Sequence, residues 1–362
     1  MFMQEIMSAL EQRTLIHLVD GQQDGTPAKL ITYELNEVQK LIRLSSFTKN
    51  LAGTKGDLFS VVQGRIGRQE LKPLAGKVST ELRDLLKMSF CELQESFPQH
   101  RFDPKVEVFL NLLTESAELL YLADTSNWLN AGALPRFCEL LNRFSQEFRG
   151  RISAPEHVKY EKNQARRVNS NIASARKFLS EKFSAEPGAL PVVLELYCEN
   201  RPWNLAASSA IPFESAQKRR KQLIRLLLKS AKSLGFIGYM WRQDFSMEKR
   251  HYCTLVLLFR PSMRDQLSSA VKRVGELWCD LDFVRGNFGC WSSPSYVFGT
   301  SKGDPYAAND RIRKNEIEAF IVGILRTDYY LRYNVENAHC PLFKTGSGDL
   351  SYLANTPRLL AA

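Results

Sequence analysis

A cluster of basic residues is the part of this sequence whose residue types and spacing most directly suggest chemistry. Seven positive charges fall within fifteen residues, and no acidic residue lies among them. The members are Lys218, Arg219, Arg220, Lys221, Arg225, Lys229 and Lys232. Ammonium and guanidinium groups at this density are typical of a site that binds the phosphates of a polyanion. The alternative is an ordinary solvated helix face.

The distribution of charge along the chain favours the polyanion. The chain has 362 residues and a formal net charge of +10. Residues 1–150 carry a net charge of −2, whereas residues 151–362 carry +12. The whole basic surplus therefore belongs to the second part, where the cluster lies.

Composition excludes several classes of protein. With 44% apolar and 24% charged residues, the chain is predicted to be globular, and its length is typical of two domains. The seven cysteines are scattered and form no C-x-x-C pair, which argues against a disulfide framework and a zinc ribbon. No apolar run is long enough to span a bilayer, and Met1–Leu10 lacks the pattern of a signal peptide. We expect a cytoplasmic protein that does not associate with membranes.

The first part of the chain, residues 1–154, is predicted to form a helical domain. Residues 49–77 are rich in glycine and are expected to form loops or turns. Asp103-Pro104 is typical of a helix start. This part has no metal-ligand spacing and no glycine-rich phosphate loop, so we expect it to dock a protein partner or a second copy. Helices are expected at 33–44, 79–93, 105–123 and 133–148.

The second part, residues 155–335, shows a mixed pattern, and residues 336–362 are expected to form a tail. A long polar helix over 155–183 leads into alternating apolar and polar residues that are typical of strands. The predicted order is strand, helix, two strands, helix, strand, helix, which indicates an α+β fold with an antiparallel, ferredoxin-like sheet and helices packed on it. Strands are expected at 191–198, 236–245, 251–260 and around 296–298, and helices at 212–234, 261–281 and 311–333.

Five short segments of the second part, taken in order, carry a resemblance to a known family. The segments are Leu194-Glu195-Leu196, Tyr239–Asp244, His251–Leu258, Thr327–Arg332 and Phe343–Gly346. Through them, residues 170–348 resemble the YagK/YfjJ C-terminal family, also described as inovirus replication-protein-like.

The resemblance implies the fold and chemistry of the HUH initiators of rolling-circle replication. In that family the third strand carries two histidines at positions i and i+2, which share one face and hold a divalent cation. A tyrosine on a nearby helix attacks the phosphorus, and a lysine three residues later assists. Here His251 matches the first histidine, but Cys253 replaces the second, and thiolate is a poor ligand for Mg²⁺ or Mn²⁺. The Tyr-x-x-Lys motif falls on Gly323 to Arg326, so the nucleophile is missing.

The resulting hypothesis is a replication-initiator-like DNA-binding protein of a phage or mobile element, with nicking lost or weakened. We expect it to bind single-stranded or hairpin DNA across the sheet and the basic helix 212–234, without a cofactor. Arg219, Arg220 and Lys221 are the expected main phosphate contacts. The further expected contacts are Lys218, Arg225, Lys229 and Arg326.

Two other functions stay open from the sequence. In the first, the protein is an active nickase: His251 and Cys253 bind Mn²⁺ or Mg²⁺ together with a carboxylate from Glu195 or Asp244. The attacking residue would then be Tyr329 or Tyr330, near the end of the last predicted helix. In the second, the protein is an interaction module that acts through its helical first part.

Overall fold

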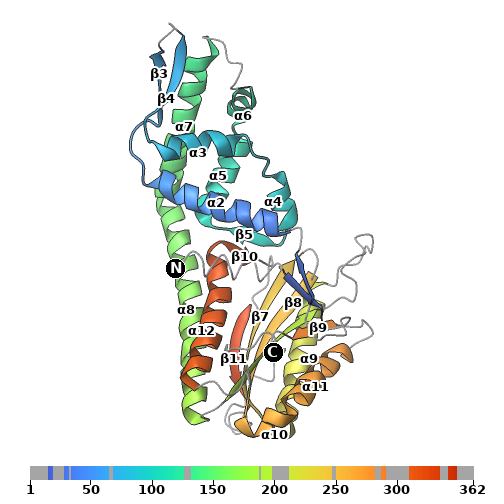
Figure 1. The fold of residues 1–362 in the computed structure, drawn as a ribbon. Helices are drawn as coiled ribbons and strands as arrows, with labels where there is room; N and C mark the ends of the chain where they lie inside the picture. Colours follow the sequence, from blue (N-terminus) through green and yellow to red (C-terminus); the bar gives the residue numbers. More distant parts are fainter. Residues whose placement is uncertain are drawn as a thin grey trace. The chain divides into compact units, whose positions relative to one another are not determined.

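In the computed structural model, the chain forms two compact units (Figure 1). The helical unit comprises Glu34–Arg167 and Asp328–Asn334; the sheet unit comprises Met1–Tyr33, Val168–Thr327 and Val335–Ala362. The structure describes residues 15–18, 28–31, 34–64, 68–125, 132–186, 189–197, 212–246, 250–281, 287–290, 310–334 and 341–348. Within that part of the chain, no helix is both long and apolar enough to cross a membrane.

These units differ from the expected domain boundaries. The described strands Leu15–Leu18 and Ala28–Ile31 group with the sheet unit rather than with the helical one, and the boundary inside the long helix falls after Arg167 rather than at 154. Residues 328–334, expected at the end of the α+β domain, return to the helical unit.

The helical unit contains seven helices among its described residues and two small strand pairs. The helices are α2 (Glu34–Ala52), α3 (Lys77–Leu86), α4 (Cys91–Ser96), α5 (Pro104–Thr114), α6 (Ala117–Asp124), α7 (Ala133–Ser153) and the first part of α8 (Pro155–Ala185). The strands are β3 (Phe59–Gln63), β4 (Gln69–Pro73), β5 (His100–Phe102) and β10 (Leu331–Tyr333). Phe109 lies at the core, and its ring meets those of Phe47, Phe144 and Phe148 edge-on at 5.7, 5.3 and 6.2 Å.

Two local predictions for this unit have different outcomes. The helix start at Asp103-Pro104 is confirmed, because the Asp103 carboxylate accepts a hydrogen bond of 2.9 Å from the backbone N–H of Lys105. The loop expected at 49–77 is instead partly the antiparallel hairpin β3–β4. The side chain of Asn142, on α7, accepts hydrogen bonds from the N–H groups of Leu58 and Phe59, so a distant residue fixes this hairpin.

The sheet unit is built on a five-stranded antiparallel sheet in the order β11-β7-β8-β6-β9. Its strands are β6 (Leu190–Tyr197), β7 (Phe236–Ser246), β8 (Arg250–Phe259), β9 (Asn287–Cys290) and β11 (Phe343–Ser347). Its helices are α9 (Phe213–Lys229), α10 (Ala231–Leu234), α11 (Leu267–Cys279), α12 (Asp310–Arg326) and the second part of α8, with η2 (Pro261–Gln266) before α11. The unit also holds the hairpin of β1 (Leu15–Leu18) and β2 (Ala28–Ile31).

The prediction of an α+β fold with an antiparallel, ferredoxin-like sheet is confirmed. The segment β6-α9-β7-β8-α11-β9 places β6 and β8 in the centre, with β7 beside β8 and β9 beside β6. This is the βαββαβ arrangement in which β8 lies between the two strands joined by α9. The strand expected around 296–298 lies outside the described residues; β9 at Asn287–Cys290 completes the arrangement.

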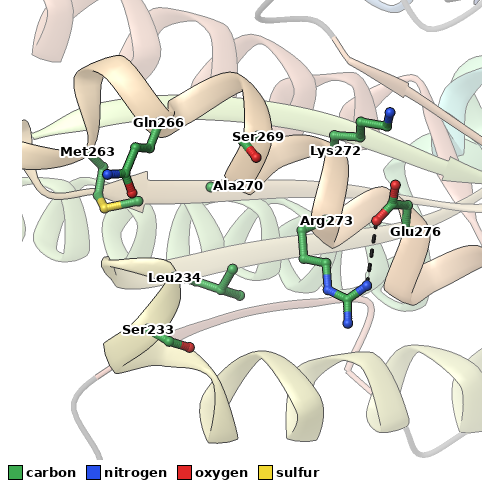
Figure 2. Close-up of a pocket in the computed structure, with 9 residues that line it drawn as sticks. All are labelled: Ser233, Leu234, Met263, Gln266, Ser269, Ala270, Lys272, Arg273 and Glu276. Atoms are coloured by element: carbon green, nitrogen blue, oxygen red, sulfur yellow. Dashed lines mark ion pairs between the residues drawn. The ribbon is translucent and has the colours of Figure 1, made fainter.

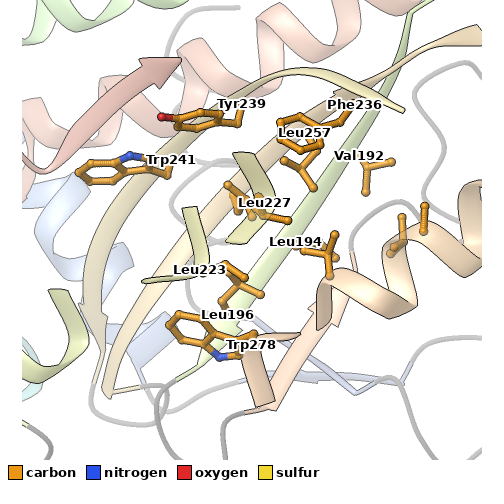
Figure 3. Packing of buried hydrophobic residues seen from close by; sticks show 14 of the residues in the cluster. Val192, Leu194, Leu196, Leu223, Leu227, Phe236, Tyr239, Trp241, Leu257 and Trp278 are labelled. Atoms are coloured by element: carbon orange, nitrogen blue, oxygen red, sulfur yellow. The ribbon is translucent and has the colours of Figure 1, made fainter. Parts of the chain in front are cut away.

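Successive side chains of a strand point to opposite faces of the sheet, and this alternation determines which residues form the core between the sheet and helices α9 and α11. Val192, Leu194 and Leu196 share one face of β6 and pack with apolar residues of the two helices (Figure 3). Gly235 ends α10 in the left-handed conformation with a φ of 68°, which confirms the predicted helix stop.

The opposite face of the sheet is also covered. Phe320, Ile321 and Ile324 of α12 lie against Met240 and Val256 of the sheet. The second part of α8 lies on this side too, because its Phe178 ring approaches Gly238. Helices α9 and α11 therefore lie on one side and α12 with α8 on the other (Figure 1), and β6 is buried along its whole length. The expectation that DNA binds across this sheet is wrong for its central strands.

Candidate nucleic-acid interface

Helix α9 divides the basic cluster between the surface and the core. Its exposed members recur three or four residues apart, so they lie on one face of the helix. We call this face the basic stripe: Lys218, Lys221, Arg225 and Lys229. Lys232 is also exposed and lies on α10, directly after the stripe. The stripe therefore retains four of the predicted contacts as solvent-accessible cations.

Arg219 and Arg220 are not surface residues, and their prediction as main phosphate contacts is wrong. Each is only 3% exposed. The Arg219 guanidinium lies 4.6 Å from the ring centre of Trp278 and donates a 2.7 Å hydrogen bond to the carbonyl oxygen of that residue. The Arg220 guanidinium lies 3.5 Å from the ring centre of Trp241 and donates to Oε1 of Gln243.

The helical period explains why these two arginines turn inward. Both lie three or four residues from Ala216 and from Leu223, which are fully buried positions of α9. A guanidinium placed on such a face needs partners in the core, and two tryptophan rings supply them. Adjacent basic residues thus fulfil opposite roles, with the inward pair anchoring the helix and the outward four facing solvent.

The two predicted metal ligands on β8 lie on the core side of the sheet. His251 is 6% exposed, and its ring meets those of Phe213 and Phe245 at centre distances of 5.8 and 5.2 Å. Burial among these rings lowers the pKa of His251 to about 4. Cys253 is 1% exposed and belongs to the apolar core between the sheet and α9.

The two predicted carboxylate ligands lie on the opposite face. In the register of the sheet, Glu195 lies beside Thr254 and Asp244 beside Tyr252, whereas His251 and Cys253 alternate with those residues on β8. The set of His251, Cys253, Glu195 and Asp244 therefore does not converge on one cation, which corrects the predicted arrangement. Among the described residues, no group of three or more His, Cys, Asp or Glu is close enough to hold a metal ion.

Both carboxylates are instead engaged in a buried hydrogen-bonded patch on the α12 side. The Tyr197 hydroxyl donates to Oε2 of Glu195 at 2.8 Å, and burial together with this carboxylate raises the pKa of Tyr197 well above its ordinary value. Oδ2 of Asp244 accepts from Arg242 and from the Tyr252 hydroxyl at 2.5 and 3.1 Å. These contacts satisfy charges that would be costly to bury alone.

The predicted nucleophiles lie beyond the end of α12. Helix α12 ends at Arg326, which is partly exposed, and is followed by the short helix η3 (Thr327–Tyr329). Tyr330 is 3% exposed, with its carbonyl oxygen accepting from the N–H of Asp103 and its ring contacted by Lys49. Tyr329 and Tyr330 belong to the helical unit, whereas His251 belongs to the sheet unit.

A groove beside the stripe was missed from the sequence. It has a volume of about 530 Å³ and lies between α10 and the segment from η2 to α11 (Figure 2). Its lining consists of Ser233, Leu234, Met263, Gln266, Ser269, Ala270, Lys272, Arg273 and Glu276. The available signal was helical spacing, because Gln266, Ser269, Arg273 and Glu276 recur three or four residues apart.

Comparison with known proteins finds no relative of this chain. No family model, no curated protein and no solved structure matches the chain. The class that the structure itself defines is an α+β protein that has a unit with a ferredoxin-like sheet, covered on both faces, and a separate helical unit.

Proposed function

We propose that the sheet unit is a DNA-binding module that holds the phosphate backbone along the basic stripe of α9. The observation that carries this proposal is the stripe itself: four exposed cations on one helix face, with no acidic residue in the sequence between Lys218 and Lys229. The charge surplus of residues 151–362 supports it, because that surplus would attract a polyanion from a distance.

The dimensions of the stripe suit a nucleic-acid strand. From Lys218 to Lys229 it extends over about 16 Å, at 1.5 Å of rise per residue. Several successive phosphates of one strand lie within that length. Each phosphate neutralised by Lys or Arg releases condensed counterions, so binding through the stripe weakens steeply as salt rises.

The proposed module binds DNA without cutting it. His251 and Cys253 are enclosed in the apolar core, and the carboxylates of Glu195 and Asp244 lie on the other face of the sheet. Together with the sequence resemblance, this arrangement supports an initiator-like protein of a phage or mobile element in which binding persists without nicking.

The test compares two variants of the full chain that lose equal charge. In the stripe variant, glutamine replaces Lys218, Lys221, Arg225 and Lys229. In the control variant, glutamine replaces four exposed cations of α8, which are Lys159, Lys162, Arg166 and Arg167. Binding of a labelled single-stranded oligonucleotide and a hairpin is measured by fluorescence anisotropy from 50 to 200 mM salt.

The stripe variant is expected to lower the slope of log K against log salt by about 3, at about 0.7 per phosphate contact on a single strand. The control variant should leave the slope within about 1 of the wild type. An unchanged slope in the stripe variant, or an equal loss in both variants, would overturn the stripe as the interface. A covalent protein–DNA adduct on a denaturing gel with Mn²⁺ would overturn binding without cutting.

A further inference from the structure

The groove between α10 and α11 begins where the basic stripe ends. Ser233, on its wall, follows Lys229 by four residues, and only Ser230 separates the end of α9 from the start of α10. Exposed Lys232 lies between them. A strand that follows the stripe would therefore arrive at the groove.

The two ends of the groove differ in chemistry. Met263 lies at one end with the amide of Gln266 beside it, Lys272 and Arg273 lie towards the other end, and Leu234 adds an apolar surface between them (Figure 2). A ligand that fits both ends has a flat apolar part with hydrogen-bonding edges and an anionic part. A nucleotide has this composition, and the volume of the groove lies in the range of small-ligand sites.

We propose that the groove holds one unpaired nucleotide of single-stranded DNA whose backbone continues along the basic stripe; this inference rests on the proposed function. The base lies against Met263 and Leu234. The Gln266 amide, which carries both donors and an acceptor, meets the edge of the base. The flanking phosphate lies at the end of the groove lined by Lys272 and Arg273.

The ion pair at the charged end does not oppose phosphate binding. Arg273 Nη1 lies 3.6 Å from Oε2 of Glu276, and both side chains are well exposed. Exposed pairs of this kind contribute little to stability, so Arg273 can exchange the carboxylate for a phosphate at small cost. Guanidinium groups bind phosphate through two parallel hydrogen bonds, which favours that exchange.

Geometry favours an unpaired base over a duplex. In a duplex the bases are stacked and paired, so the face of a base is not accessible to a groove in the protein. A base enters a groove between two helices only after it leaves its stack, which costs least in a single strand. The stripe binds either form through phosphates, whereas the groove adds affinity only for the single strand.

The test places a bulky side chain in the groove and leaves the residues of the basic stripe unchanged. Ser269 lines the groove and is exposed, so Ser269→Phe is expected to fold and to occupy the site of the base. Ser268, its exposed neighbour, does not line the groove, so Ser268→Phe is the matched control. Affinities are measured for one sequence as a single strand, as a duplex, and as a single strand with abasic positions.

In Ser269→Phe the single-strand affinity should fall about fivefold to tenfold, which corresponds to the loss of one base contact. Duplex affinity and the salt slope should not change, and Ser268→Phe should match the wild type. Abasic positions should weaken the wild type but not Ser269→Phe. Equal losses for single strand and duplex, or no loss at all, would overturn the groove site. If the proposed function itself is wrong, the salt slope of the stripe variant will match that of the wild type, and this result is separate from the effects of Ser269→Phe.

Discussion

The four adjacent residues from Lys218 to Lys221 offer a sharp test, because two of them face solvent and two are buried against tryptophan rings. Two double variants remove the same charge. The outer variant is Lys218→Gln with Lys221→Gln, and the inner variant is Arg219→Gln with Arg220→Gln. If side-chain position decides function, the outer variant loses binding and the inner variant loses stability.

The magnitudes follow from the contacts. Each outer lysine contributes about 0.7 to the salt slope on a single strand, so the outer variant should lower it by about 1.4. Substitutions of this kind on the surface change the free energy of unfolding by about 0.5 kcal/mol or less. Each inner arginine loses a desolvated cation–π contact, about 2 kcal/mol, and a hydrogen bond from a charged donor. Because neighbouring effects are not additive, we expect the inner variant to lose about 3–5 kcal/mol in all.

The assay measures both quantities on each variant. Urea denaturation is followed by tryptophan fluorescence, since Trp241 and Trp278 contact the inner arginines, and binding is followed by anisotropy under folding conditions. An inner variant with native stability and a reduced salt slope would refute the burial argument. An outer variant that loses stability rather than binding would refute it as well.

Two further predictions concern buried titratable groups of the sheet unit. His251 has a pKa of about 4 when folded, below its ordinary value of 6.5, so the unfolded chain binds more protons between these values and stability falls as the pH falls. From pH 7 to pH 4 the wild type should lose about 3 kcal/mol more than His251→Gln, measured by urea denaturation; parallel pH profiles would contradict this. Asp244→Asn should lower the free energy of unfolding by about 3–5 kcal/mol, because Arg242 stays buried without that carboxylate. Adding Arg242→Met should restore part of the loss, and a double variant less stable than Asp244→Asn would count against the ion pair.

The central sheet could be predicted from the sequence because its signals are local. Strands β6, β7 and β8 lie within one residue or so of their predicted bounds, since each alternates or is continuously apolar between turn residues. The short link between β7 and β8 and the helices around them were enough to indicate the antiparallel order. The stop at Gly235 followed from glycine chemistry alone.

The end of the last helix could not be predicted in this way. The segment from Thr327 to Tyr333 is compatible with a helix, but Leu331–Tyr333 pairs with His100–Phe102, more than two hundred residues earlier in the chain. Backbone hydrogen bonds to that remote strand override the local preference. Tyr329 and Tyr330, expected on this helix, therefore lie beyond the end of α12.

For the candidate site, the sequence located the charge but not its orientation. The inward direction of Arg220 could be predicted from the sequence, because Arg220 lies four residues after Ala216 and three before Leu223 and so shares their face of the helix. The sequence could not predict that Glu195 and Cys253 lie on opposite faces of the sheet, because this depends on the register between β6 and β8. Cys253 pairs with Leu196, which puts Glu195 on the other face, and a shift of one residue would have put Glu195 on the same face as Cys253.

Because helices cover both faces of the sheet, its central strands offer no open surface to a nucleic-acid strand. Sheets that bind single strands stack bases on exposed aromatic residues, but Tyr197, Tyr252 and Trp241 are buried here. Trp241 and Trp278 contact Arg220 and Arg219 and hold them inward, which fixes the rotation of α9. That rotation presents Lys218, Lys221, Arg225 and Lys229 outward together. If the proposed function holds, affinity comes mainly from phosphates and should depend strongly on salt and weakly on sequence, and the proposed groove site is where a base would be contacted.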